Sequence, residues 1–199
     1  MKKKVSALVL AVCVLFSLSA CGGPSRESAE TVVKNALDAV KSCDFSKMAE
    51  YWGDGTISAD DFTDDLVDEE IVKAIFSGLT YEVLGSEEKE STATVEVKIS
   101  NVDMTQVMTN IMTELFSALS DENFLNEMEQ MTEEDAARYF TDQFVEALQR
   151  SDNARVESTV TIPLSLVDGK WVIDDASDAV VDAMLGGISA LEDAMSDMF

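Results

Sequence analysis

The stretch VESTVTIPLSLVDGKWVID, residues 156–174, decides the fold class of this chain. Apolar residues occupy every second position over much of its first half, which is the period of a strand that buries one face. The pair Asp168-Gly169 is typical of a two-residue hairpin turn, and the residues after it, KWVID, predict the returning strand. An antiparallel hairpin is therefore expected here. The alternating apolar positions are Val156, Val160, Ile162, Leu164 and Leu166.

Two further strands are predicted earlier in the chain. Residues 79–84 (LTYEVL) and 93–99 (ATVEVKI) alternate in the same way, and the polar residues 85–89 between them predict a hairpin loop. The sheet is thus expected to hold about four antiparallel strands.

Helical spacing of apolar residues predicts helices over residues 27–42, about 59–77, about 104–150 and about 176–198. Residues 44–58 are expected to be irregular. Asp103 with Gln106 resembles a capping box, and Thr132 with Asp135 resembles another helix start. Gly186-Gly187 is expected to weaken or kink the last helix.

This order of elements, with its late Asp-Gly-Lys-Trp-Val-Ile hairpin at residues 168–173, resembles the nuclear-transport-factor-2-like (cystatin-like) cone found in many uncharacterised bacterial lipoproteins. The resemblance covers about residues 27–175 and implies a curved sheet around the first helix that leaves a cup. The helical block between the second and third strands and the C-terminal helix are additions to that pattern. We predict a single α+β domain over residues 27–199.

The N-terminus predicts export. Three lysines at residues 2–4 precede an apolar run over residues 5–18 and small residues after it, the pattern of a secretory signal peptide. Leu18-Ser19-Ala20-Cys21 resembles the lipobox of bacterial lipoproteins. The resemblance implies cleavage between Ala20 and Cys21, which removes residues 1–20, and lipid such as palmitate on Cys21. Residues 21–26 would be the lipidated cysteine and a short tether, and the protein would lie on the extracytoplasmic face of a membrane. The alternative is a secreted protein in which Cys21 is incidental.

Composition excludes several kinds of chemistry. Without residues 1–20 the chain has three fewer basic residues and all 39 acidic ones, a formal charge of −28 against −25 for the whole chain; such a surface repels nucleic acid. Histidine is absent, which removes histidine-based nucleophilic and metal sites. Cys43 would be the only other cysteine in the mature chain, so no internal disulfide is expected, and a buried thiol is its ordinary role. No cofactor is predicted.

Two motifs could bind metal, although we predict no metal site. Residues 50–61 resemble part of an EF-hand calcium loop, but the third position is Trp52, which offers no oxygen ligand. Met104, Met108 and Met112 lie one helical turn apart, as thioether ligands of Cu(I) could, yet their stripe continues with aliphatic residues and is better explained as core.

The segment 104–120 carries Glu114 as its only charged residue in a very acidic chain. A solvated helix face here would be expected to carry carboxylates. We therefore expect this helix to be covered on more than one side, either by the helices that follow it or by a partner.

Three functions remain open. The favoured hypothesis is a non-catalytic lipoprotein that binds a small ligand or an envelope protein. Tyr51, Trp52, Tyr81 and Trp171 are candidate lining of the cup, although membership of the core is the favoured explanation for each of them. The second is an enzyme that uses carboxylates in the cup, and the third is a structural or inhibitory partner of an envelope protein. We predict no enzymatic activity.

Overall fold

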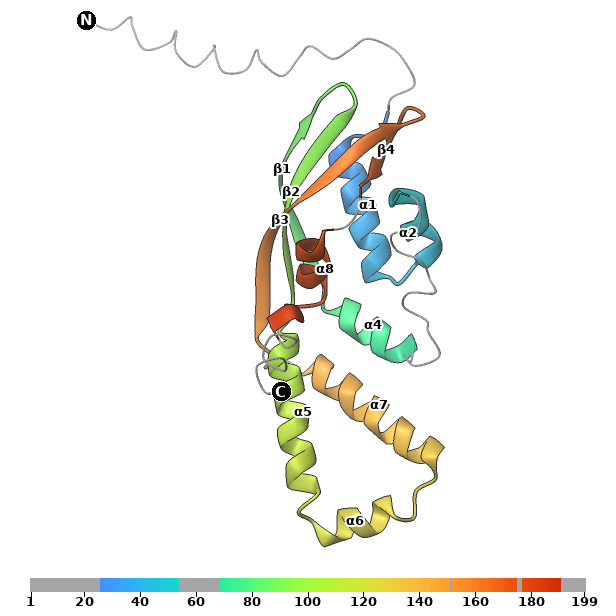
Figure 1. The fold of residues 1–199 in the computed structure, drawn as a ribbon, viewed down its shortest axis with the longest axis vertical. Helices are drawn as coiled ribbons and strands as arrows, with labels where there is room; N and C mark the ends of the chain where they lie inside the picture. Colours follow the sequence, from blue (N-terminus) through green and yellow to red (C-terminus); the bar gives the residue numbers. More distant parts are fainter. Residues whose placement is uncertain (1–25, 54–68, 151, 175–176, 191–199) are drawn as a thin grey trace, which may run out of the picture.

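The computed structural model describes residues 26–53, 69–150, 152–174 and 177–190 (Figure 1). The predicted signal peptide, the tether up to residue 25 and residues 54–68 lie outside these ranges. In chain order the elements are α1 (Ala29–Lys41), α2 (Phe45–Tyr51), α4 (Glu69–Ser77), β1 (Thr80–Glu88), β2 (Thr92–Val102), α5 (Met104–Ala118), α6 (Glu122–Met128), α7 (Glu133–Gln149), β3 (Arg155–Val167), β4 (Lys170–Ile173) and α8 (Asp178–Met184).

The fold is α+β, with one four-stranded antiparallel sheet in the order β1-β2-β3-β4. Asp168 and Gly169 both have positive φ, 49° and 81°, as a two-residue turn between twisted strands requires. The predicted hairpin at residues 156–174 is therefore confirmed, together with the fold class, the helical insertion between β2 and β3, and a C-terminal helix.

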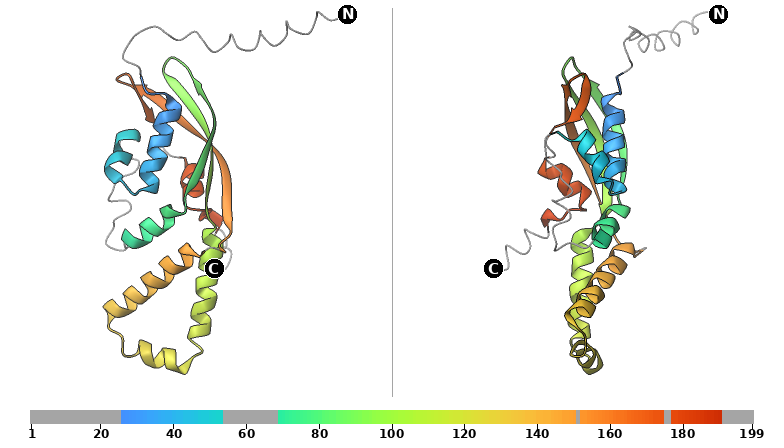
Figure 2. Two further views of the ribbon diagram at one scale, coloured as in Figure 1. Left: turned by 180° about the vertical axis from the view of Figure 1, so that it is seen from behind. Right: turned by 90° about the vertical axis from the view of Figure 1, so that its right-hand side faces the viewer.

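The helices α1 and α8 cover the same face of the sheet (Figure 2). Alternation along β2 sends Val95, Val97 and Ile99 into this layer, where they are fully buried, against Val33 and Leu37 of α1. The intervening residues of β2 lie on the opposite face, where Thr94 and Glu96 are exposed. The inner face, which would line an open cup, is thus core in the described part of the chain.

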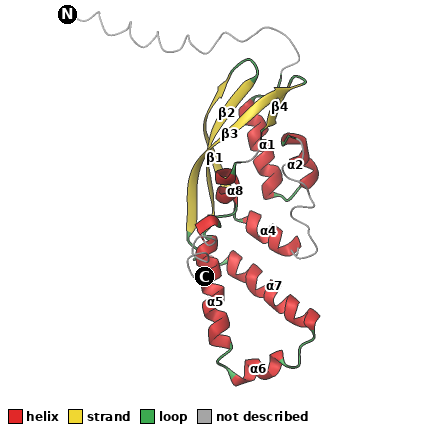
Figure 3. Cartoon of the chain, viewed as in Figure 1, coloured by secondary structure: helices red, strands yellow, loops and turns green. Residues whose placement is uncertain are grey.

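The helices α5, α6 and α7 form an arm over residues 104–150 that extends beyond the end of the sheet (Figure 3). Its base is packed: Met104 and Val107 of α5 meet Ala147 and Leu148 of α7, with Ala74 of α4 in the same cluster. The arm therefore does not plug the inner face of the sheet, which α1 and α8 occupy instead.

Two predictions of irregular structure are wrong. Residues 45–51, expected to be irregular, form α2, because the Asp44 carboxylate caps the helix by accepting from the Lys47 N–H at 3.2 Å. The predicted loop at residues 85–89 is mostly strand, since β1 passes a register shift between Val83 and Gly85 and stays paired to Glu88.

The last helix ends instead of kinking. The helix α8 stops at Met184, and Gly186 and Gly187 follow with φ of 70° and 78°. A Cβ atom at Gly186 would lie 1.9 Å from the Val102 carbonyl oxygen, so the chain can pass here only with glycine. The rest of the predicted helix, from residue 191, lies outside the described ranges.

A buried amide joins α4 and α8 to the sheet close to the start of the arm. Asn101, the last but one residue of β2, is 1% exposed, and its Nδ2 donates to the Met184 carbonyl at 2.7 Å and to the Ile75 carbonyl at 3.1 Å. One side chain thus ties the end of α8 and the end of α4 to β2, three residues before α5 begins at Met104. We call this site the Asn101 junction.

Asn101→Ala should destabilise the protein by roughly 2–4 kcal/mol, because two buried carbonyl groups lose their donor and a small cavity opens. Urea unfolding followed by circular dichroism measures the loss. Asn126→Ala is the matched control: Asn126 is exposed and donates only to Glu122 of its own helix, so its effect should stay within about 0.5 kcal/mol. Equal losses for both variants would contradict the role of the junction.

Candidate functional site

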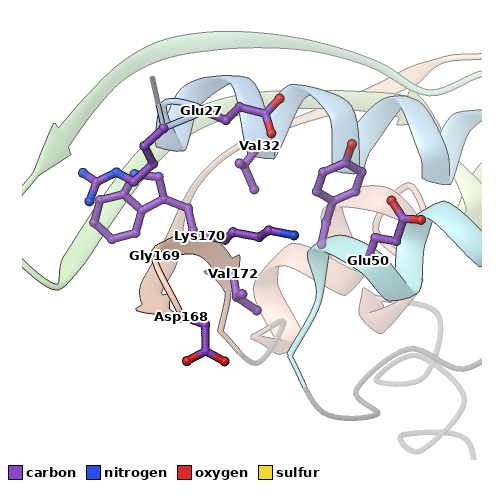
Figure 4. A pocket seen from close by; sticks show the side chains of 10 residues that line it. Glu27, Val32, Glu50, Asp168, Gly169, Lys170 and Val172 are labelled. Carbon is purple, nitrogen blue, oxygen red and sulfur yellow. The ribbon is translucent and has the colours of Figure 1, made fainter. Parts of the chain in front are cut away.

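A groove of about 920 Å³ lies where the start of α1, the end of α2 and the β3–β4 turn come together (Figure 4). Its charged side chains are of both signs. Arg26 and Lys170 face Glu27, Glu50 and Asp168 around it, and the Lys170 side chain extends across the groove in the direction of Glu50. A groove of this kind could bind a polar small molecule.

Contacts at Arg26 fix the start of α1 beside the groove. The Arg26 guanidinium lies 4.3 Å from the Trp171 ring centroid, a cation–π arrangement, and its Nη2 pairs with Glu88 at 3.3 Å. Glu88 also accepts from the Ala29 N–H at 2.8 Å. The start of α1 is thereby held between β1 and β4. No pattern in the sequence predicted this contact of Arg26 with Trp171.

The four aromatic residues predicted to line a cup are not brought together. Trp52 and Trp171 are buried in the core, and only Trp171 and Tyr51 border the groove. Tyr81 lies elsewhere, on β1, where its hydroxyl donates to Asp38 Oδ1 at 2.8 Å. The core alternative is thus correct for both tryptophans, and Tyr81 serves to fasten α1 to the sheet.

The outer part of the arm is the second candidate site. Within residues 108–146, all of which the structure describes, no residue is buried. Of the eight large hydrophobic side chains that are exposed in the described chain, five lie here, 42% to 67% exposed. They are Met112, Phe116, Leu119, Leu125 and Phe140. This part of the protein is an assembly of amphipathic helices with no core of its own.

The prediction that the helices after residue 120 cover α5 on more than one side is therefore wrong. Thr109 and Thr113 are exposed, because α7 packs against α5 only near the base of the arm, within the cluster around Val107. The segment 104–120, with its single charged residue, forms part of this exposed surface of α5. Cover by a partner, the other reading of that segment, stays a prediction.

A hollow of about 70 Å³ lies between the three helices of the arm. Phe124 of α6 and Tyr139 of α7 meet on one side of it with ring centroids 5.9 Å apart, and Ile111 and Leu115 of α5 line the other side. The hollow exceeds the roughly 10–15 Å³ that one water molecule needs on the same measure. Its lining is mostly apolar. It suits an aliphatic side chain better than water.

Neither of the two metal-like sequence motifs forms a metal site within the described residues. Residues 54–61 of the calcium-like loop lie outside the described ranges, and Trp52 at its third position is buried. Met104 is buried, Met108 packs against the base cluster, and Met112 is exposed, so core packing explains only the first two. No group of three or more cysteine, aspartate or glutamate side chains in the described ranges is placed to hold a metal ion.

Side-chain hydrogen bonds form at two of the predicted helix starts. Thr132 and Asp135 form a complete capping box. Asp103 accepts from the Gln106 N–H at 3.0 Å, but the Gln106 side chain accepts from Ala154 N at 2.7 Å instead of closing a box. Gln106 thus helps to hold the start of β3 against the arm.

Cys43 is half-buried at the end of α1. Burial raises the pKa of its thiol above the ordinary value, which disfavours the reactive thiolate. Ala20 and Cys21, the residues predicted to flank the cleavage site, with lipid predicted on Cys21, lie outside the described ranges. No helix within those ranges is both long and apolar enough to cross a bilayer.

The class defined by this geometry is an α+β domain with an antiparallel sheet and a projecting helical arm. No family model and no curated protein matches the chain. Among solved structures, YcdA of Bacillus subtilis subsp. subtilis strain 168, a candidate lipoprotein, is similar, with 14% sequence identity and a TM-score of 0.45. The match covers 80% of this chain and 47% of YcdA, so the chain spans about half the length of that protein. At this TM-score the likeness supports no statement about function.

Tyr81 should titrate later than an ordinary tyrosine. Its partial burial, and then the bond to Asp38, raise the pKa of Tyr81 from about 10 to about 12. Because the folded state favours the neutral phenol, the stabilisation is complete below pH 10 and is lost as the pH rises through 12. A titration of tyrosinate ultraviolet absorbance should show one late step that Tyr81→Phe removes. A step near pH 12 that persists unchanged in Tyr81→Phe would contradict the assignment of the raised pKa to Tyr81.

Proposed function

We propose that this protein is a lipid-anchored, extracytoplasmic binding protein without catalytic activity, which presents its helical arm to a protein partner. The observation that carries the proposal is the uncovered apolar surface of the arm. Five large hydrophobic side chains exposed within one segment of a soluble, acidic domain are typical of an interaction site.

The anchor rests on the N-terminal sequence. The signal-like segment and Leu18-Ser19-Ala20-Cys21 support lipid on Cys21, which leaves five peptide links to Arg26. Such a connection spans at most about 18 Å. The end of the domain that carries Arg26 and the groove would therefore lie close to the membrane.

The arm lies at the other end of the molecule. Figure 1 shows the start of α1 beside the two hairpins at one end of the long axis and α6 at the opposite end. An anchor at Cys21 would therefore hold the arm away from the bilayer, where it can reach the exposed part of an envelope protein. The surface best suited to binding and the predicted anchor are thus placed so that they do not compete.

The groove supports a second candidate, a small polar ligand bound near the membrane. Its support is that Lys170, three acidic side chains and Tyr51 all line the groove. The carboxylate enzyme remains an alternative at the same place, with Glu27, Glu50 and Asp168 as its available acids. The groove is open and mixed in charge, so the arm is the better supported site.

Cys21→Ala should abolish incorporation of labelled palmitate and move the protein from the membrane fraction to the soluble fraction, because a thioether-linked lipid can form only on the cysteine. Palmitate labelling of cells followed by fractionation measures both effects. Cys43→Ala is the matched control and should leave labelling unchanged. Continued labelling of the Cys21→Ala variant would refute the anchor.

A photoreactive phenylalanine analogue at position 116 should form an adduct with an envelope protein in intact cells, because Phe116 is the most exposed large hydrophobic side chain of the arm. The same analogue at Leu84 is the control, since that side chain is also exposed but lies on β1. Mass spectrometry of the adducts identifies the partner. An absence of adducts at position 116, or the same adducts from both positions, would argue against the arm as the binding surface.

A further inference from the structure

The helix α5 carries two apolar stripes. Ile111, Leu115 and Ala118 follow the i, i+4, i+7 spacing and line the hollow between the helices of the arm. Met112, Phe116 and Leu119 follow the same spacing one residue on, about 100° around the helix. The second stripe therefore runs along α5 on the side that no described helix covers. We call these three residues the outer stripe.

The outer stripe has no charged neighbours on its own helix. In α5 the single charged residue is Glu114, and it is held by Arg150, whose Nη1 lies 2.6 Å from Glu114 Oε1. The positions beside the stripe are Thr109 and Thr113, whose hydroxyls donate to carbonyl groups one turn earlier in the helix. The surface thus has the width and the polarity of a helix–helix contact.

The arm as a whole is strongly negative. Residues 104–150 contain ten acidic and two basic side chains, and one of the two bases, Arg150, already pairs within the arm. A field of this sign attracts cationic partners and repels acidic ones. It follows that two copies of this chain would meet at the arm only against repulsion between their acidic residues.

We propose that the outer stripe of α5 binds a basic amphipathic helix of an envelope protein. This inference rests on the proposed function and specifies the chemistry of its partner. The apolar face of the partner helix packs on Met112, Phe116 and Leu119, which follow a spacing that helix-in-groove recognition uses. Its lysine and arginine residues complement the net negative charge of the arm. The partner would supply the buried surface that the outer arm lacks.

The direct test uses residues 21–199 with Cys21→Ser, a form that contains every buried residue of the described core and needs no detergent. The probe is an amphipathic helical peptide of leucine and lysine, and the matched probe has glutamate in place of each lysine. We expect calorimetry to show binding of the lysine peptide alone, weakened by added salt. Phe116→Gln should reduce the affinity about tenfold, as loss of an interface aromatic does, and Leu84→Gln less than twofold.

Several results would overturn the inference. They are equal binding of the two peptides, no binding of either, or the same affinity in Phe116→Gln as in the unaltered chain. A dimer that Phe116→Gln disrupts would assign the outer stripe to a second copy, and a photo-adduct between position 116 and residues 191–199 would assign it to the chain itself. An adduct at position 116 with a segment that is not a basic helix would leave the proposed function standing and remove only this inference.

Discussion

The positions of α4 and α8 against the sheet, at the point where the arm leaves it, depend on the buried amide of Asn101. Its two N–H groups meet the carbonyls that end α4 and α8, so three elements far apart in the sequence share one side chain. Around it, the Met104 N–H donates to the Gly186 carbonyl at 3.1 Å, and the Arg155 Nη2 donates to the Gly78 and Ser100 carbonyls. Since an unpaired buried carbonyl is costly, these bonds hold the direction in which β2 continues into the arm.

This junction divides the protein into two regions of different character. On one side, the sheet and α1 bury a continuous core in which Leu37, Val97 and Leu164 are fully enclosed. On the other side, packing ends with the cluster around Val107, and the outer arm is made of helices with no buried residue. Helices gain most of their stability from tertiary packing, so the outer arm should open more readily than the sheet. Low local stability of this kind suits a surface that is completed by a partner.

The arrangement at the opposite end is electrostatic. Arg26 stacks on Trp171 and pairs with Glu88, which fixes where the chain enters the domain and shapes the wall of the groove. Because the arm leaves from the far end of β2, the orientation proposed for the protein at a membrane follows from the direction of the sheet.

The sequence by itself determined the strands, the turn at Asp168-Gly169, most helices and the uncharged character of residues 104–120, because these depend on local periodicity and on residues that suit few conformations. It also contains the N-terminal pattern on which the anchor proposal depends. Only the tertiary structure decided that Asn101 is a junction, that Trp171 lies under Arg26, and that the outer stripe of α5 is bare. The first two depend on contacts between residues at least 26 positions apart in the chain. For the third, periodicity records that a face is apolar without recording what packs against it.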